Sequence, residues 1–151
     1  MIYLLETIVS NDSEEVRIAA CRLFASITGN NKKVQWFASL AGAVNLSVQF
    51  ERENTAKAKE VVLGSLLAFL KAENFAGKVQ FIEDFEGLRL LVKWILDCDV
   101  VPDKDKPEEF KYGNKAQNRK IKLKLLQLLN DLVLNDDSIL PGGNQIRALY
   151  S

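Results

Sequence analysis

The chain repeats itself at a spacing of just over forty residues, and this limits it to a small set of folds. The tripeptide Lys-Val-Gln occurs at residues 33–35 and again at residues 78–80. The same register, 45 residues, pairs Gly42 with Gly87. The apolar pattern of residues 16–28 returns 42 residues later, at residues 58–70. Repeats of about 40–47 residues that hold two or three helices are typical of armadillo and HEAT arrays.

Each repeat has the signals of helices and none of strands. Ser13 precedes two glutamates and an apolar helical pattern, which marks a helix start, and Gly29 with two asparagines marks its end. We predict an all-α, armadillo/HEAT-like right-handed α-solenoid of about three to four repeats. The whole chain, 1–151, would form one such domain or a fragment of a longer one. The predicted repeats are about 1–12 (partial), 13–54, 55–96 and 118–140, with a solvated insertion loop at 97–117.

The composition excludes several classes of function. The 151 residues include no histidine, so neither a Ser-His-Asp system nor a His-ligated zinc is available. Two cysteines cannot form a four-thiolate metal site. We therefore expect no enzyme, no catalytic residue, no metal and no cofactor. Twenty basic and twenty acidic side chains give no global attraction to nucleic acid or to a membrane, so we expect neither as a partner, and we expect a monomer.

The repeat register also suggests where a partner would bind. In armadillo arrays the third helices line the concave surface, which places Asn45 and Gln49 there in one repeat and Arg89, Lys93 and Trp94 in the next. Lys120 and Lys124 would extend this path. Trp94 aligns with Gln49, which indicates partial exposure, although core packing is the other interpretation. Trp36 aligns with Phe81 and is predicted to be core.

One basic cluster stands out, and it is interpreted as a solvated helix face or as part of a protein-binding face. It contains no aromatic side chain on which a single-stranded nucleic acid could stack. Its members are Lys115, Arg119, Lys120, Lys122 and Lys124.

Several segments resemble the armadillo-type nucleotide exchange factors of the seventy-kilodalton heat-shock chaperones. The similar segments are Glu15-Val16-Arg17, residues 30–35 (Asn-Asn-Lys-Lys-Val-Gln), residues 41–43 (Ala-Gly-Ala), residues 55–67, Phe81-Ile82-Glu83 with Gly87, and residues 120–133. The ending Asn-Asp-Leu-Val at residues 130–133 is similar to the endoplasmic-reticulum branch, the Sil-type factors that act on the lumenal chaperone BiP. The cytosolic branch is the second choice.

The resemblance implies a co-chaperone rather than an enzyme. Factors of this family embrace one lobe of the chaperone's ATPase domain, open its cleft and so promote ADP release. It also implies a location in the endoplasmic-reticulum lumen, with a signal peptide outside this chain, or in the cytoplasm as the alternative. The competing interpretation is a generic armadillo adaptor or scaffold that binds another protein or a peptide.

Overall fold

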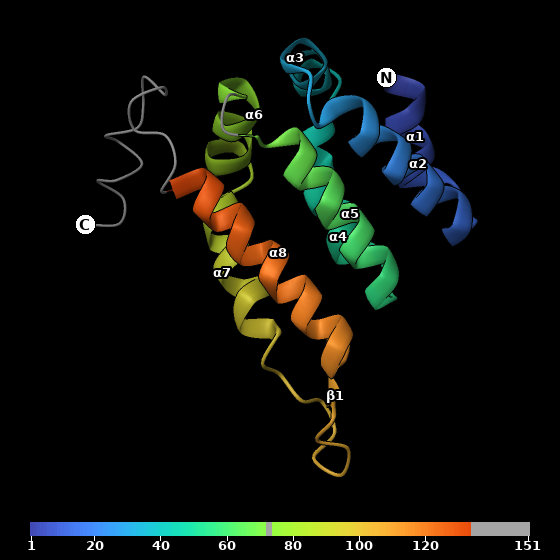
Figure 1. The fold of residues 1–151 in the computed structure, drawn as a ribbon, viewed down its shortest axis with the longest axis vertical. Coiled ribbons are helices and arrows are strands. Elements are labelled where there is room, and N and C mark those ends of the chain that lie inside the picture. Colours follow the sequence, from blue (N-terminus) through green and yellow to red (C-terminus); the bar gives the residue numbers. More distant parts are fainter. Residues whose placement is uncertain (72–73, 134–151) are drawn as a thin grey trace.

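The computed structural model describes residues 1–71 and 74–133 (Figure 1). The helices are α1 (Ile2–Ser10), α2 (Glu14–Thr28), α3 (Lys32–Leu40), α4 (Leu46–Arg52, after a 3₁₀ turn at Ala43–Asn45), α5 (Ala56–Phe69), α6 (Phe75–Val79, followed by a π-helical turn at Gln80–Asp84), α7 (Gly87–Asp97) and α8 (Lys115–Val133). Two short strands, β1 (Glu109–Phe110) and β2 (Gly113–Asn114), precede α8. The predicted all-α class is confirmed. The predicted end of the last repeat, 134–140, lies outside the described residues.

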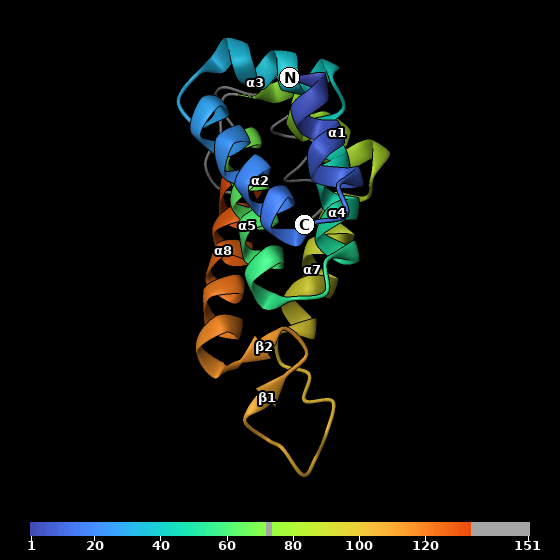
Figure 2. The same cartoon turned by 90° about the vertical axis from the view of Figure 1, so that its right-hand side faces the viewer.

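The helices form two layers. Helices α2, α5 and α8 lie side by side in one layer, and α1, α4 and α7 lie in the other (Figures 1 and 2). Helices α3 and α6 lie at one end of both layers. The order long helix, short helix, second-layer helix therefore occurs twice, as α2-α3-α4 and as α5-α6-α7. A single apolar core fills the space between the layers, with Ile8, Phe24, Leu66, Leu91 and Leu125 among its fully buried side chains.

The two three-helix units also share their capping chemistry. Ser13 and Thr55 cap α2 and α5, each through a hydroxyl that accepts from a backbone amide of the first turn. Asn31 and Asn74 cap α3 and α6 in the same way, with side-chain oxygens 3.1 and 3.2 Å from the amides. An N-cap of this kind stabilises a helix by about 1 kcal/mol. The repeat is thus encoded at the helix ends as well as in the apolar pattern.

The turn before the third helix of each unit contains a residue in the left-handed conformation. The positions of these two residues shift the predicted alignment of the repeats by one residue. Gly42 has φ +88°, and its structural counterpart is Glu86, with φ +49°, rather than the predicted Gly87. Gly87 is required for a different reason, because a Cβ there would lie 2.3 Å from the Phe81 ring. The two positions that look equivalent in sequence therefore meet different constraints.

A partly buried ion pair joins the two layers. The Arg17 guanidinium on α2 donates two hydrogen bonds, 2.8 and 2.9 Å long, to the carboxylate of Glu53, the residue after α4. The Gln49 side chain donates to the same carboxylate at 2.8 Å. Arg17 also donates to the Asn11 and Asp12 carbonyls before α2. These contacts fix α4 against α2 and the loop that precedes α2.

The segment 97–117, predicted to be a solvated loop, is in fact tied to the core at one end. Residues 102–109 are exposed, but β1 and β2 form an antiparallel hairpin whose turn residue Tyr112 is buried. The Tyr112 ring packs edge-on against Phe50, with the centroids 5.8 Å apart. Residues 115–117 belong to α8 rather than to the loop. An aromatic residue at the turn explains the difference, because its burial orders the strands around it.

The hairpin depends on a glycine, which gives a first testable prediction. Gly113 has φ +107°, and a Cβ there would lie 2.8 Å from the Ala56 Cβ of α5. We expect Gly113→Ala to lower the free energy of unfolding by about 1–3 kcal/mol in a denaturant titration. Gly64→Ala is the matched control, since a Cβ there meets nothing closer than 3.7 Å. The control should be neutral or slightly stabilising. Equal effects of the two changes would contradict the packing of the hairpin on α5.

None of the helices in the described ranges combines the length and the hydropathy that crossing a bilayer requires.

Candidate protein-binding face

Helices α4 and α7 are joined by aromatic packing and by one hydrogen bond. The Phe50 ring of α4 and the Trp94 ring of α7 lie 4.5 Å apart, centroid to centroid. The Trp94 indole Nε1 donates to the Glu51 carboxylate at 3.1 Å. Lys93, the preceding residue on α7, places its ammonium 3.7 Å from the same carboxylate. Together α4 and α7 form one continuous surface of the second layer.

The outer side of α7 mixes exposed apolar and basic side chains. Arg89, Val92, Lys93 and Leu96 are all exposed, and Leu96 is 64% exposed. Their spacing of three, four and seven residues places them on one side of the helix. We call this set the α7 ridge. The sequence reasoning named Arg89 and Lys93 but missed Val92 and Leu96, although the same helical spacing contains the signal. Apolar side chains with basic neighbours suit contact with another protein.

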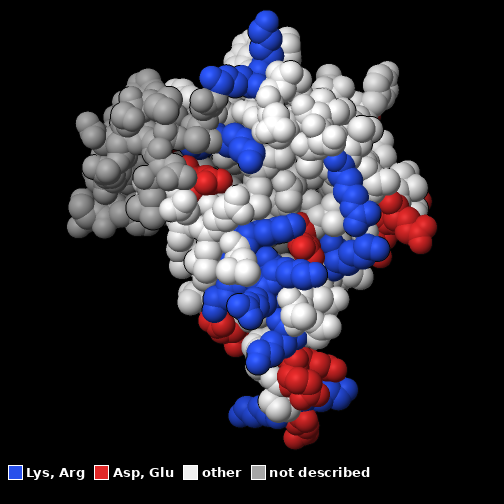
Figure 3. Space-filling view, in the orientation of Figure 1, with Lys and Arg blue, Asp and Glu red and all other residues white. Residues whose placement is uncertain are grey.

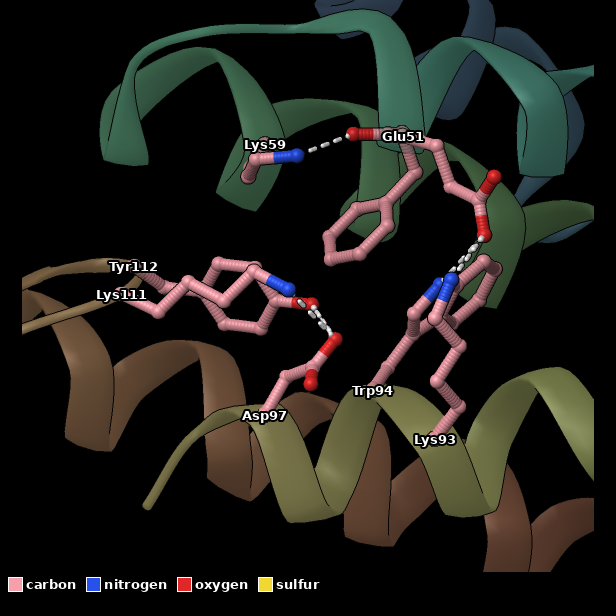
Figure 4. Close-up of a pocket in the computed structure, with 8 residues that line it drawn as sticks. Glu51, Lys59, Lys93, Trp94, Asp97, Lys111 and Tyr112 are labelled. Carbon is pink, nitrogen blue, oxygen red and sulfur yellow. Dashed lines mark hydrogen bonds and ion pairs between the residues drawn. The ribbon is translucent and has the colours of Figure 1, made fainter. Parts of the chain in front are cut away.

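A pocket of about 280 Å³ lies beside the ridge, between α4, α5, α7 and the hairpin (Figure 4). Three lysines and two carboxylates surround an aromatic wall. Its lining residues are Phe50, Glu51, Lys59, Lys93, Trp94, Asp97, Lys111 and Tyr112. We call it the α4–α7 pocket.

The charges in the α4–α7 pocket are arranged in pairs, with one exception. Lys111 contacts the Asp97 carboxylate at 3.0 Å, and the Tyr112 hydroxyl donates to the same carboxylate at 3.2 Å. Burial, together with the Asp97 charge, raises the pKa of the Tyr112 hydroxyl, so it stays protonated and acts as a donor. Lys59 instead donates to the Phe50 carbonyl at 2.7 Å, and burial lowers the pKa of its ammonium.

Two of the predicted contact residues are buried, and the expectation that they face a partner is wrong. Trp94 is only 1% exposed, because its ring fills the space between α4 and α7. Gln49 is buried because its side chain binds the Glu53 carboxylate. Trp36 was predicted to be core, yet it is 51% exposed on α3. The burial of Trp94 agrees with the core-packing interpretation, whereas the predicted burial of Trp36 is wrong.

The remaining predicted residues fall into two groups. Arg89 and Lys93 are exposed on the α7 ridge, and Asn45 is exposed before α4, where its amide donates to the Gly42 carbonyl at 3.1 Å. Lys120 and Lys124 instead belong to α8, in the layer of α2 and α5. Lys124 lies 3.3 Å from Glu60 of α5. Figure 3 shows the basic side chains gathered over α8 and α5. These lysines do not extend the path from α4 and α7, which corrects the predicted site.

Apolar side chains are also exposed at the other end of the layers. Met1, Ile2 and Leu4 of the N-terminal segment face Phe37 and Leu40 of α3 across an apolar groove of about 490 Å³. Phe37 and Leu40 are exposed, as is Trp36 beside them. We call this the α1–α3 groove.

In the part of the chain that the structure describes, no three cysteine or acidic side chains are grouped so that they could hold a metal ion. The surface of α4 and α7 is one of shape, apolar contact and paired charge.

No protein-family model, no curated protein and no solved structure matches the chain.

Proposed function

We propose that the protein is a nucleotide exchange factor that binds the ATPase domain of a heat-shock-seventy chaperone of the BiP type and promotes release of ADP. One observation carries the proposal. The segments that resemble this family, apart from residues 120–133 of α8, lie within the two three-helix units. Within residues 30–35, for example, Asn31 caps α3 and Gln35 is buried, where it donates to the Thr28 carbonyl. The resemblance therefore lies in fold-determining residues and supports the family's architecture. The α7 ridge supplies a surface for the partner.

The proposed mechanism needs rigid shape rather than a reactive group. A factor that lowers the affinity of a chaperone for ADP a hundredfold must supply about 2.7 kcal/mol of coupling free energy. It does so by binding the open form of the ATPase domain more tightly than the closed form. The partly buried ion pair of Arg17 and Glu53 fixes α4 against α2, and the aromatic contact of Phe50 with Trp94 fixes α7 against α4. A fixed surface of this kind resists closure of the bound lobe.

The test is release of fluorescent ADP from an isolated ATPase domain. A BiP-type domain and a cytosolic domain are loaded separately, and the protein is added to each. Acceleration of release with either domain supports an exchange factor. Faster release from the BiP-type domain would support action in the endoplasmic-reticulum lumen, and faster release from the cytosolic domain would support the cytoplasm. Binding without acceleration, or no binding, would reject the exchange activity.

A charge reversal locates the binding face. We expect Lys93→Glu to weaken binding to the ATPase domain by about tenfold, because it reverses an exposed charge on the α7 ridge. Lys93 is 60% exposed, so the substitution should leave the fold intact. Lys120→Glu, an equal change on α8, is the matched control and should leave the affinity unchanged. The affinities are measured by titration calorimetry. If Lys120→Glu weakens binding and Lys93→Glu does not, the partner binds α8 instead.

A generic protein-binding adaptor is the second candidate function. The α1–α3 groove favours it, since exposed apolar surface of this kind commonly contacts another protein. An adaptor would bind through this groove without any effect on ADP release. Leu40→Glu would weaken such binding, whereas Lys93→Glu would not.

A further inference from the structure

We propose that the α4–α7 pocket binds a carboxylate group, carried by an acidic side chain of a protein partner. The inference goes beyond the exchange activity, because it requires only a partner with an exposed aspartate or glutamate. It is drawn from the arrangement of three ammonium groups, two carboxylates and three aromatic rings around one cavity (Figure 4).

Lys59 is the lysine of the pocket whose ammonium does not contact a carboxylate. Lys93 lies 3.7 Å from Glu51, and Lys111 lies 3.0 Å from Asp97. The Lys59 ammonium has a carbonyl as its hydrogen-bond acceptor, at 2.7 Å from the Phe50 oxygen. Within the described ranges, no carboxylate lies within 4.0 Å of it. An ammonium has three donors, so two remain for a ligand.

The surroundings of Lys59 strengthen its attraction for an anion. Its ammonium lies 4.8 Å from the centre of the Phe50 ring and 5.3 Å from that of Tyr112. The rings lower the polarity on one side of the ammonium, and a charge pair beside them interacts more strongly than in bulk water. Burial lowers the pKa of this ammonium, and the nearby Glu51 and Glu53 carboxylates oppose that shift. A carboxylate in the pocket would supply a counter-charge in direct contact with the ammonium.

The size and the charge of the pocket select the ligand. A volume of about 280 Å³ is at the lower limit of small-molecule sites, and it suits one side chain of a partner. Among the lining residues the three lysines exceed the two carboxylates by one charge, and Glu53, which also acts on Lys59, is paired with Arg17. A singly charged carboxylate therefore balances the charge of the lining residues, whereas a doubly charged phosphate would leave an excess negative charge. The pocket opens beside the α7 ridge, so a partner on the ridge could insert an acidic residue.

The test uses the Trp94 indole as a reporter inside the pocket. Its Nε1–H donates to Glu51, so its proton resonance responds to a new charge nearby. Trp36, the other tryptophan, lies on α3 and serves as the internal control. The probe is a blocked tripeptide with glutamate in the middle, and the same peptide with glutamine is its uncharged match. We expect the glutamate peptide alone to shift the Trp94 resonance saturably, with a dissociation constant in the millimolar range.

Variants of Lys59 complete the test. Lys59→Met should abolish the shift, and Lys59→Arg, which keeps the charge, should retain it. Lys57→Met is the matched control, since Lys57 is an exposed lysine one half-turn earlier on α5. The inference is overturned if the glutamate peptide gives no saturable shift in the unmodified protein, if the glutamine peptide gives the same shift, or if folded Lys59→Met retains it. The peptide comparison holds even where Lys59→Met fails to fold.

Discussion

Glu53→Ala should lower the free energy of unfolding by about 3 kcal/mol, because it leaves a half-buried guanidinium without the carboxylate that accepts two of its hydrogen bonds. The Glu53 side chain is 3% exposed and that of Arg17 is 18% exposed. The lost carboxylate is the acceptor of two hydrogen bonds from Arg17 and one from Gln49. Water can reach part of the Arg17 guanidinium, which places the expected cost at the low end of the range for buried pairs. The measurement is a urea titration followed by circular dichroism.

The control for Glu53→Ala is Glu108→Ala, which also removes one negative charge but from an exposed position in the segment before the hairpin. It should change the free energy of unfolding by less than about 0.5 kcal/mol. The double substitution of Arg17 and Glu53 by leucine should cost less than Glu53→Ala alone, since no unpaired charge is left in the core. If the double variant loses as much free energy of unfolding as the Arg17→Leu and Glu53→Leu single variants lose in total, the two side chains are not coupled.

Because of the Glu53 carboxylate, we expect the free energy of unfolding to decrease at acid pH. Burial by itself would raise the pKa of Glu53, but hydrogen bonds from Arg17 and Gln49 outweigh it and hold the pKa below its ordinary value. The folded state therefore binds fewer protons than the unfolded chain, in which the pKa of a glutamate is about 4.3. The stabilisation is fully present above that pH and is lost as the pH falls through the lower folded pKa. The difference in the free energy of unfolding between the wild type and Glu53→Gln should therefore become smaller in this acid range.

Trp94→Ala has the other large expected effect, a loss of about 4 kcal/mol. The indole is 1% exposed, packs on Phe50 at 4.5 Å and fills the space between α4 and α7. Its removal leaves a cavity that the rigid helices cannot close. Any loss of partner binding by this variant would therefore report unfolding rather than a lost contact. Chemical denaturation followed by circular dichroism measures the effect without relying on the tryptophan signal.

Two further variants separate the causes. Trp36→Ala removes the same ring from an exposed site and should cost less than about 1 kcal/mol. Trp94→Phe keeps most of the buried ring and removes the indole donor to Glu51. Its loss of unfolding free energy should therefore lie between those of Trp36→Ala and Trp94→Ala. If Trp36→Ala were as destabilising as Trp94→Ala, the environments assigned to the two rings would be wrong.

The repeat could be found from the sequence because both of its determinants are local. Apolar spacing fixes which side of a helix is buried, and Ser13, Asn31, Thr55 and Asn74 mark helix starts by chemistry that depends on a few neighbouring residues. The helix predicted to start after Ser13 and to end at Gly29 has the bounds of α2 for this reason. The all-α class follows from these signals alone. The arrangement of the helices as an armadillo solenoid stays a prediction.

The environments of Trp36 and Gln49 were predicted wrongly and that of Trp94 was left open between two interpretations, because each depends on contacts outside its own helix turn. Trp94 is buried since Phe50, 44 residues earlier in the chain, supplies a ring to pack on. Gln49 is buried since Glu53 needs a donor in addition to Arg17. An alignment of one repeat with the next gives equivalent positions, but the neighbours of those positions differ. The α7 ridge could have been predicted from the sequence, because its residues follow the spacing of a single helix.

The segment between α7 and α8 offers a place to attach a probe. Residues 102–109 project from the body of the protein (Figure 1), while Tyr112 anchors the chain at the core. Both cysteines are buried, and burial raises the pKa of each thiol, Cys21 and Cys98, to about 11. Native thiols in this state react slowly with alkylating dyes at neutral pH. A Lys104→Cys substitution would therefore carry a fluorophore at one defined point, in an exposed segment outside the proposed binding face.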